Sequence, residues 1–187
     1  LLELQLDVRP TSNIYKVLDA KLLQPYADIP FNPYKQAIVM FLSEFLTRAL
    51  REEEQNLPLF EYLRYSFSFL DWCGQGFANF HIVFLLRLTR FVGIYPNVEN
   101  YHAGDCFDLL NASFVRVQPL THPHFLAPAD AAYIPQLVRI NYQTMPLFRF
   151  SREERGRILA VLNEFYSLHL PDFPELKSLQ VLRELFD

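Results

Sequence analysis

Residues 77–92 constrain the fold most, because this segment is apolar on nearly every side rather than along one stripe. A helix of this kind is stable only when other elements surround it, so the pattern predicts a central helix that ends at Gly93. Arg87 and Arg90 are charged exceptions, and their spacing of three places them on one helix face. The rest of the chain must supply the elements that cover this segment.

Two amphipathic helices are predicted before the central segment. Asn32 followed by Pro33 is typical of a helix start. Apolar residues then recur at helical spacing, at Ile38, Phe41, Leu42, Phe45, Leu46 and Ala49. The three glutamates at 52–54 are typical of a solvated helix end, and a second helix is predicted to begin near Pro58.

Further helices are predicted toward the C-terminus. Ser151 and Glu154 form a capping-box pattern, which predicts a helix start. Helical spacing also appears over 129–145, where Pro135 is expected to kink or split the helix. Residues 175–186 predict a closing helix, so the chain is expected to be a mainly α-helical bundle.

Two regions depart from the helical period. Leu2, Leu4 and Leu6 alternate with polar residues, and a second alternating stretch over 13–18 completes a predicted β-hairpin. A lone hairpin is marginal in water, so we expect its apolar face to pack against strands that precede this sequence. Residues 95–125 predict a short irregular hairpin insertion, which we expect four side chains to hold together: Phe107, Leu109, Phe114 and Val115.

Composition excludes several classes of protein. With 51% hydrophobic residues and only 5 Gly in 187 residues, the chain is neither disordered nor collagen-like. Two cysteines are too few for a disulfide framework and favour a cytoplasmic location. No apolar run approaches the roughly 18 residues that cross a membrane. A net charge of −4 implies that any nucleic-acid contact is local.

Motifs for catalysis are mostly absent: the sequence has no phosphate-binding glycine loop, no G-x-S-x-G elbow and no H-E-x-x-H pair. His102, Cys106, His122 and His124 carry zinc-ligand chemistry within one irregular stretch, although their spacing matches no standard zinc finger. Two interpretations stay open. These residues are either ordinary loop residues or a metal site that a metal-dependent enzyme could use.

The basic residues form a local cluster. Between 139 and 157, five arginines stand against Glu153 and Glu154; they are Arg139, Arg149, Arg152, Arg155 and Arg157. They either contact an anion such as phosphate or pair with the two acids and solubilise the helix. Arg87 and Arg90 lie on a helix too apolar for full exposure, so each needs a carboxylate partner or an anionic ligand. A groove with apolar walls and an arginine at its lip would suit a peptide that ends in an aromatic residue and a carboxylate.

Several short segments carry a family resemblance: ALREE (49–53), NFH (79–81), FLLRL (84–88), FVG (91–93), FDL (107–109), LHLP (168–171) and LKSL (176–179). They run along almost the whole chain, and the LKSL tail is the most family-specific. On these segments the chain resembles RecO, the bacterial recombination mediator, in the form found in Bacteroides-like bacteria.

The resemblance implies two domains. Residues 1–24 would be the last strands of an N-terminal OB-fold, and residues 25–187 a helical domain that carries the insertion at 95–125. It also implies a non-enzymatic DNA repair and recombination protein without a cofactor. Such a protein binds single-stranded DNA and single-strand binding protein, anneals complementary strands and, with RecR, helps RecA to load.

The resemblance also suggests sites. A groove against the central helix would receive the acidic tail of single-strand binding protein, with Arg87 or Arg90 on its carboxylate and Phe84 or Phe91 as apolar walls. Phosphate contacts would come from Arg149, Arg152, Arg155, Arg157 and Lys177. Many relatives carry a four-cysteine zinc ribbon where this chain has only Cys106, so we expect a metal-free insertion. The rival interpretations are a metal-dependent enzyme and a purely structural helical domain.

Overall fold

The computed structural model describes residues 1–9, 14–50, 55–174 and 176–185, and the glutamate run at 52–54 lies outside them. Its strands are β1 (Leu2–Asp7), β2 (Lys16–Leu22), β3 (Cys106–Asp108), β4 (Ser113–Val115) and β5 (Phe125–Leu126). Its α-helices are α1 (Pro33–Ala49), α2 (Leu57–Trp72), α3 (Phe80–Leu88), α4 (Pro128–Ala131), α5 (Ile134–Leu137), α6 (Arg152–His169) and α7 (Ser178–Leu185). Short 3-10 helices are η1 (Ile29–Phe31), η2 (Phe77–Asn79) and η3 (Met145–Leu147).

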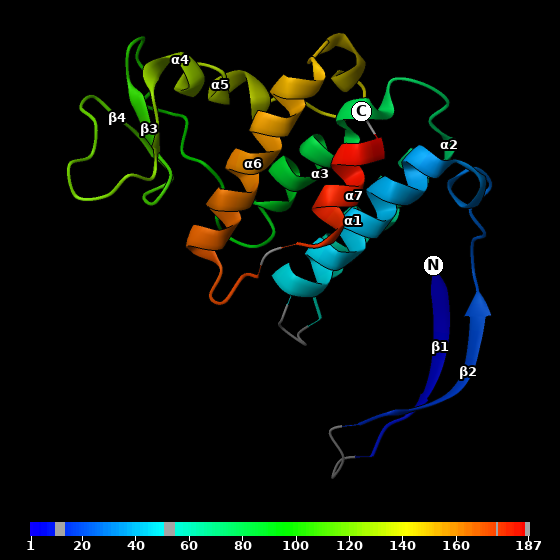
Figure 1. Cartoon of the computed structure of the whole chain (residues 1–187). Helices are drawn as coiled ribbons and strands as arrows, with labels where there is room; N and C mark the ends of the chain where they lie inside the picture. The colour runs from blue at the N-terminus through cyan, green and yellow to red at the C-terminus, as the bar shows by residue number, and fades with distance from the viewer. Residues whose placement is uncertain (10–13, 51–54, 175, 186–187) are drawn as a thin grey trace.

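Helix α3 is the core element, as its all-round apolar pattern predicted. Every residue from Phe80 to Leu86 is buried, and the other long helices lie around them (Figure 1). The helix is shorter than predicted, because η2 precedes it and a turn replaces its last residues. The Thr89 hydroxyl donates to the carbonyl of Leu86, and Gly93 adopts a left-handed φ of 76° that ends the turn.

Local capping signals place the starts of the covering helices as predicted. The Asn32 side chain accepts hydrogen bonds from the backbone of Tyr34 and Lys35 at the start of α1. Both hydrogen bonds of the capping box between Ser151 and Glu154 are present at the start of α6. These caps satisfy backbone N–H groups that have no partner inside their helices.

Two other helical predictions need correction in their bounds. In place of the helix predicted over 129–145, the chain forms two separate four-residue helices, α4 and α5, of which α4 begins at Pro128, and Pro135 lies in the first turn of α5. The closing helix starts only at Ser178, because the Glu44 carboxylate of α1 accepts the backbone N–H groups of Lys177 and Ser178 there. Proline and this cap therefore set limits that apolar periodicity alone does not show.

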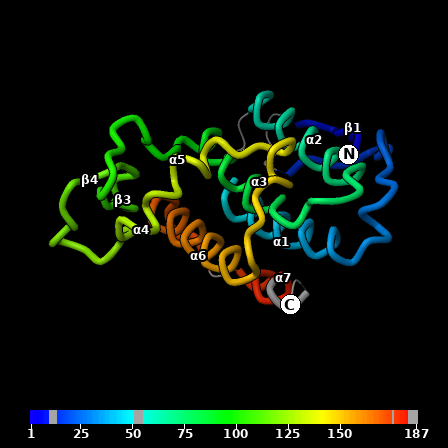
Figure 2. Tube along the Cα trace, turned by 90° about the horizontal axis from the view of Figure 1, so that it is seen from above, coloured from blue at the N-terminus to red at the C-terminus, as the bar shows by residue number. Residues whose placement is uncertain are grey.

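The insertion is a three-stranded antiparallel sheet in the order β4-β3-β5, so the predicted hairpin gains a third strand. Phe107 and Leu109 are 1% and 2% exposed and form a second small core, against which Phe114 packs. Val115 is half-buried and pairs with Cys106. Figure 2 shows the insertion at one end of the molecule, with α6 between it and α1.

The N-terminal hairpin projects away from the helices (Figure 1). Strands β1 and β2 are antiparallel, and β2 lies later than the predicted 13–18 stretch. One face carries the apolar pairs Leu2 with Leu22, Leu4 with Ala20 and Leu6 with Val17. All of its leucines and Val17 are at least 40% exposed, so this face is uncovered in the structure. No helix in the described ranges is long and apolar enough to cross a bilayer.

Candidate partner-binding pocket

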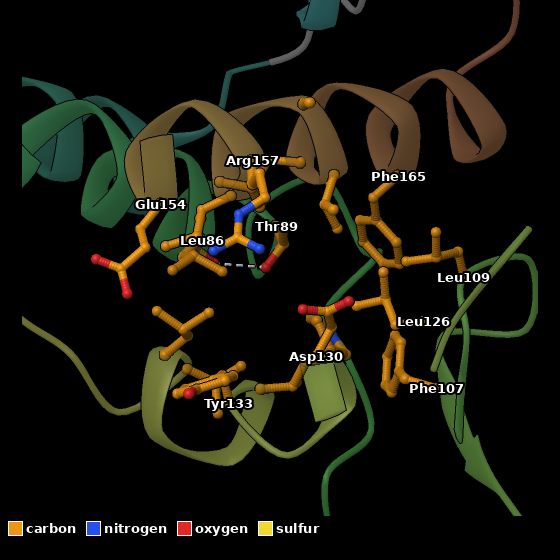
Figure 3. Close-up of a pocket in the computed structure, with 18 of the residues that line it drawn as sticks. Leu86, Thr89, Phe107, Leu109, Leu126, Asp130, Tyr133, Glu154, Arg157 and Phe165 are labelled. Atoms are coloured by element: carbon orange, nitrogen blue, oxygen red, sulfur yellow. Dashed lines mark hydrogen bonds between the residues drawn. The ribbon is translucent and has the colours of Figure 1, made fainter. Parts of the chain in front are cut away.

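A cavity of about 360 Å³ lies between α6 and the α4–α5 pair, with the insertion at one end and the end of α3 as part of its floor (Figure 3). Its walls are mainly apolar and include Leu86, Phe107, Leu109, Leu126, Ile158 and Phe165. Polar side chains are few. This is the combination expected of a pocket that buries an apolar group and fixes its orientation with a small number of charges.

Three charged residues line the pocket: Arg157 and Glu154 from α6, and Asp130 from α4. In Figure 3 the Arg157 guanidinium points into the space between the two acids. Hydrogen bonds from the backbone and then the hydroxyl of Ser151 lower the pKa of Glu154, and the charge of Arg157 lowers it further. The Glu154 carboxylate is thus occupied by the helix cap, whereas Asp130 is the acid that faces Arg157 across the pocket.

The four residues predicted to form the groove do not gather at this pocket. Phe84 is completely buried and packs against Tyr62 within the core, so its ring offers no wall to a surface groove. Phe91 is half-buried and stacks on Tyr62 at 4.8 Å. The burial of Phe84 could not be foreseen, because a helix that is apolar all round gives no sign of which face is open.

The two central arginines also have individual surroundings. Arg90 is exposed, lies over the Tyr95 ring at 4.4 Å and donates to its hydroxyl. Arg87 is half-buried. Its charge opposes the rise in the pKa of the Tyr142 hydroxyl that burial causes. In the described part of the chain, neither arginine has a carboxylate within ion-pair distance. Their expected carboxylate partners are therefore not found there.

The predicted phosphate-contacting residues divide between two hollows. Arg157 lines the first pocket, while Arg152 and Arg155 line a second cavity of about 410 Å³ beside α7. Arg152 and Arg155 thus share a side of α6, and Arg155 also donates to the Phe150 carbonyl. Arg149 and Lys177 are exposed and line neither cavity.

The candidate metal ligands do not converge. His102 lies 3.4 Å from Asp105, His122 lies 3.5 Å from Asp108, and His124 lies 2.8 Å from Glu164. Cys106 is buried in β3. No group of three His, Cys, Asp or Glu side chains in the described ranges could hold a metal ion. Each histidine instead faces a separate carboxylate.

Sequence reasoning missed the far wall of the pocket. Asp130, Tyr133 and Ile134 come from two short helices and the turn between them, and the apolar periodicity there is too brief to indicate an exposed face. The only local signal was the Pro128 and Pro135 pair, which marks two helix starts but not what they face.

Comparison with known proteins identifies the family. The family model described as "Recombination protein O C terminal" matches residues 30–180. The chain belongs to the RecO family. The DNA repair protein RecO of Bacteroides fragilis is 54% identical over 187 residues, covering 100% of this chain and 77% of the relative. RecO of Phocaeicola vulgatus is 55% identical over 186 residues, with the same coverage.

More distant RecO proteins also match over the full chain, for example that of Porphyromonas gingivalis at 32% identity over 190 residues and 76% of the relative. No solved structure gave a significant match. RecO membership confirms the resemblance drawn from the short segments and the mainly helical C-terminal domain. It also supports a role for this chain in DNA repair and recombination.

Proposed function

We propose that this RecO chain is a DNA repair mediator whose pocket captures the acidic C-terminal tail of single-strand binding protein. The observation that carries the proposal is one guanidinium, Arg157, pointing into a mainly apolar cavity of about 360 Å³. A C-terminal aromatic side chain would fill the cavity while its carboxylate binds the guanidinium. This places the peptide site at Arg157 instead of at Arg87 or Arg90.

Asp130 gives the proposal a sharp test. Its carboxylate lines the same pocket as Arg157 and would repel an acidic peptide. Fluorescence anisotropy with a labelled peptide of three aspartates followed by Leu-Phe and a free carboxylate should show about tenfold weaker binding to Arg157→Gln. Asp130→Asn should bind the peptide more tightly than the unaltered chain. Arg90→Gln serves as the matched control, because Arg90 is held on Tyr95 and does not line the pocket.

If Arg157→Gln and the unaltered chain bound the peptide with equal affinity, the peptide site would not be at Arg157. Binding lost in Arg90→Gln or Arg87→Gln instead would return the peptide to the groove inferred from sequence. No affinity for the peptide, for single-strand binding protein or for DNA would favour a purely structural domain.

Single-stranded DNA is the second proposed partner. Five residues are proposed to supply phosphate contacts: Arg149, Arg152, Arg155, Arg157 and Lys177. Four of them are exposed and Arg155 is half-buried, so their charges can be reached from solvent. Affinity should fall steeply with added salt, and the slope of log affinity against log salt should lessen by about one for each contact removed.

The hairpin is proposed to belong to an OB-fold, and RecR to be the partner with which the protein promotes RecA loading. The exposed face of Leu2, Leu4 and Leu6 supports the barrel, because an apolar sheet face of this kind is normally covered. A structure that includes further strands on this face would test it. Loading of RecA on strands coated with single-strand binding protein, with and without RecR, would test the activity.

A further inference from the structure

The insertion forms one end of the pocket, and within the described ranges two polar contacts attach it to α6. Phe107, Leu109 and Leu126 of the insertion line one end of the cavity, next to Phe165 of α6 (Figure 3). Their apolar contact with Phe165 forms the small second core. The shape of the pocket therefore depends on how firmly the insertion rests on α6.

The first contact joins His124 and Glu164. The Nδ1 atom of His124 lies 2.8 Å from Oε1 of Glu164, and a carboxylate can only accept, so Nδ1–H is the donor. The two side chains are 39% and 45% exposed. Water screens such a pair, and its contribution is accordingly modest.

The second contact passes through Leu109. Its carbonyl oxygen accepts a hydrogen bond from Nε2 of His169 at 2.9 Å, and its backbone N–H donates to the carbonyl of His124 at 3.1 Å. The His169 ring also packs on Phe165 at 4.5 Å. Leu109 therefore links both histidines to a side chain that lines the pocket.

The other histidines of the region bind within the insertion itself. His122 faces Asp108 and His102 faces Asp105, and these four residues all belong to the 95–126 segment. They stabilise the insertion but do not attach it to α6. In the part of the chain that the structure describes, the attachment consists of the His124–Glu164 and His169–Leu109 contacts together with the small core.

We propose that these two contacts, which we call the pin, hold the insertion against α6 as the wall that closes the pocket, so that binding of a peptide in the pocket and docking of the insertion on α6 are coupled. The coupling rests on the proposed function of the pocket. A bound peptide that touches both α6 and the insertion favours the docked arrangement. By thermodynamic linkage, the factor by which a bound peptide favours docking of the insertion equals the factor by which docking raises the affinity for the peptide, so loosening the insertion lowers that affinity. Glu164, His124 and His169 are positioning residues.

The variants separate the pin from general destabilisation. Glu164→Ala removes the first contact, and Glu164→Gln retains an acceptor for Nδ1–H. His169→Phe keeps a ring against Phe165 but removes the donor to Leu109. Glu153→Ala is the matched control, because Glu153 is an exposed acid of α6 that lines the other cavity.

Amide hydrogen exchange of the 187-residue chain, read over 106–109 and 125–126, is the direct measurement. Exchange should accelerate about threefold in Glu164→Ala and about three- to tenfold in His169→Phe. The double variant should exceed either single variant, while α1–α3 remain unchanged. Glu164→Gln and Glu153→Ala should match the unaltered chain. Saturating the chain with the peptide that ends in Leu-Phe should slow amide exchange in the same segments.

Unchanged exchange in the double variant would overturn the pin. A peptide that binds the unaltered chain without slowing exchange over 106–109 would overturn the coupling alone. If the peptide does not bind at all, the proposed peptide function fails and the coupling fails with it, whereas the exchange rates of the variants still decide whether the pin exists.

Discussion

The ammonium group of Lys35, in the first turn of α1, is completely buried and lies 2.7 Å from the Asp28 carboxylate. The same ammonium donates to the backbone carbonyl of Asp71 at 2.8 Å and lies over the Phe77 ring. Lys35 therefore joins α1 to the segment at Asp28, to α2 at Asp71 and to η2 at Phe77, near the point where the hairpin connects to the helices.

Replacing Lys35 should destabilise the chain through this joint. Lys35→Ala leaves a cavity and removes both polar contacts, and breaking buried pairs is costly. Because Asp28 remains 49% exposed and can hydrate, we expect a loss of about 2–3 kcal/mol rather than more. Lys35→Met, which retains most of the volume, should lose less. Urea unfolding measures both, and an Ala variant as stable as the Met variant would contradict the argument.

Asp71 holds the connecting segment from the other side. Its carboxylate accepts the backbone N–H groups of Ala27, Asp28 and Ile29 at 2.8–2.9 Å. Burial raises the pKa of Asp71, but these three hydrogen bonds and the Lys35 charge outweigh burial, so the net pKa is lowered. Asp71→Asn turns an NH₂ toward a backbone donor and should cost about 1–3 kcal/mol at neutral pH.

The pH dependence of this loss has a definite sign. A depressed carboxyl pKa stabilises the fold above the unfolded value near 4 and loses that stabilisation as pH falls below it. The difference in free energy of unfolding between the unaltered chain and Asp71→Asn should therefore shrink as the pH falls from about 4 to about 2. A difference that stays constant down to pH 2 would argue against the bound carboxylate.

His81 should control stability in a higher pH range. It is 3% exposed in α3, and burial together with the charge of Arg155 lowers the pKa of His81 to about 3. Between pH 6.5 and that value the unfolded chain binds a proton that the folded chain does not, so the free energy of unfolding falls as the pH drops. From pH 7 to pH 5 the loss should be about 2 kcal/mol. In His81→Phe, the free energy of unfolding measured by urea titration should fall less between pH 7 and pH 5 than in the unaltered chain. An equal fall in both chains would refute the role of His81.

The C-terminal helix should depend on Glu44. This α1 side chain accepts the backbone N–H groups of Lys177 and Ser178 and also the Ser178 hydroxyl. Glu44→Ala removes a helix cap of α7, worth about 1 kcal/mol. Limited proteolysis should then cut near 174–178 at lower protease concentrations than in the unaltered chain. Glu61→Ala, at an exposed position of α2, provides the control, and equal cleavage of both variants would contradict the cap.

Local signals explain which parts of the fold could be predicted. Asn32 before Pro33, and Ser151 with Glu154, predicted two helix starts because capping requires only neighbouring residues. The all-round apolar pattern of α3 predicted its central position for a similar reason, since such a helix has no side that favours water. The segments LHLP and LKSL correctly indicated the RecO family.

Short-range sequence patterns were thus enough to indicate the main helices, the central helix and the family. Packing in three dimensions was needed to show that Arg157 and Asp130 line one pocket, that Phe84 is buried and that His124 faces Glu164. Caps and periodicity depend on residues a few positions apart. The walls of a cavity are side chains brought together from distant segments by packing, and no local pattern records that meeting.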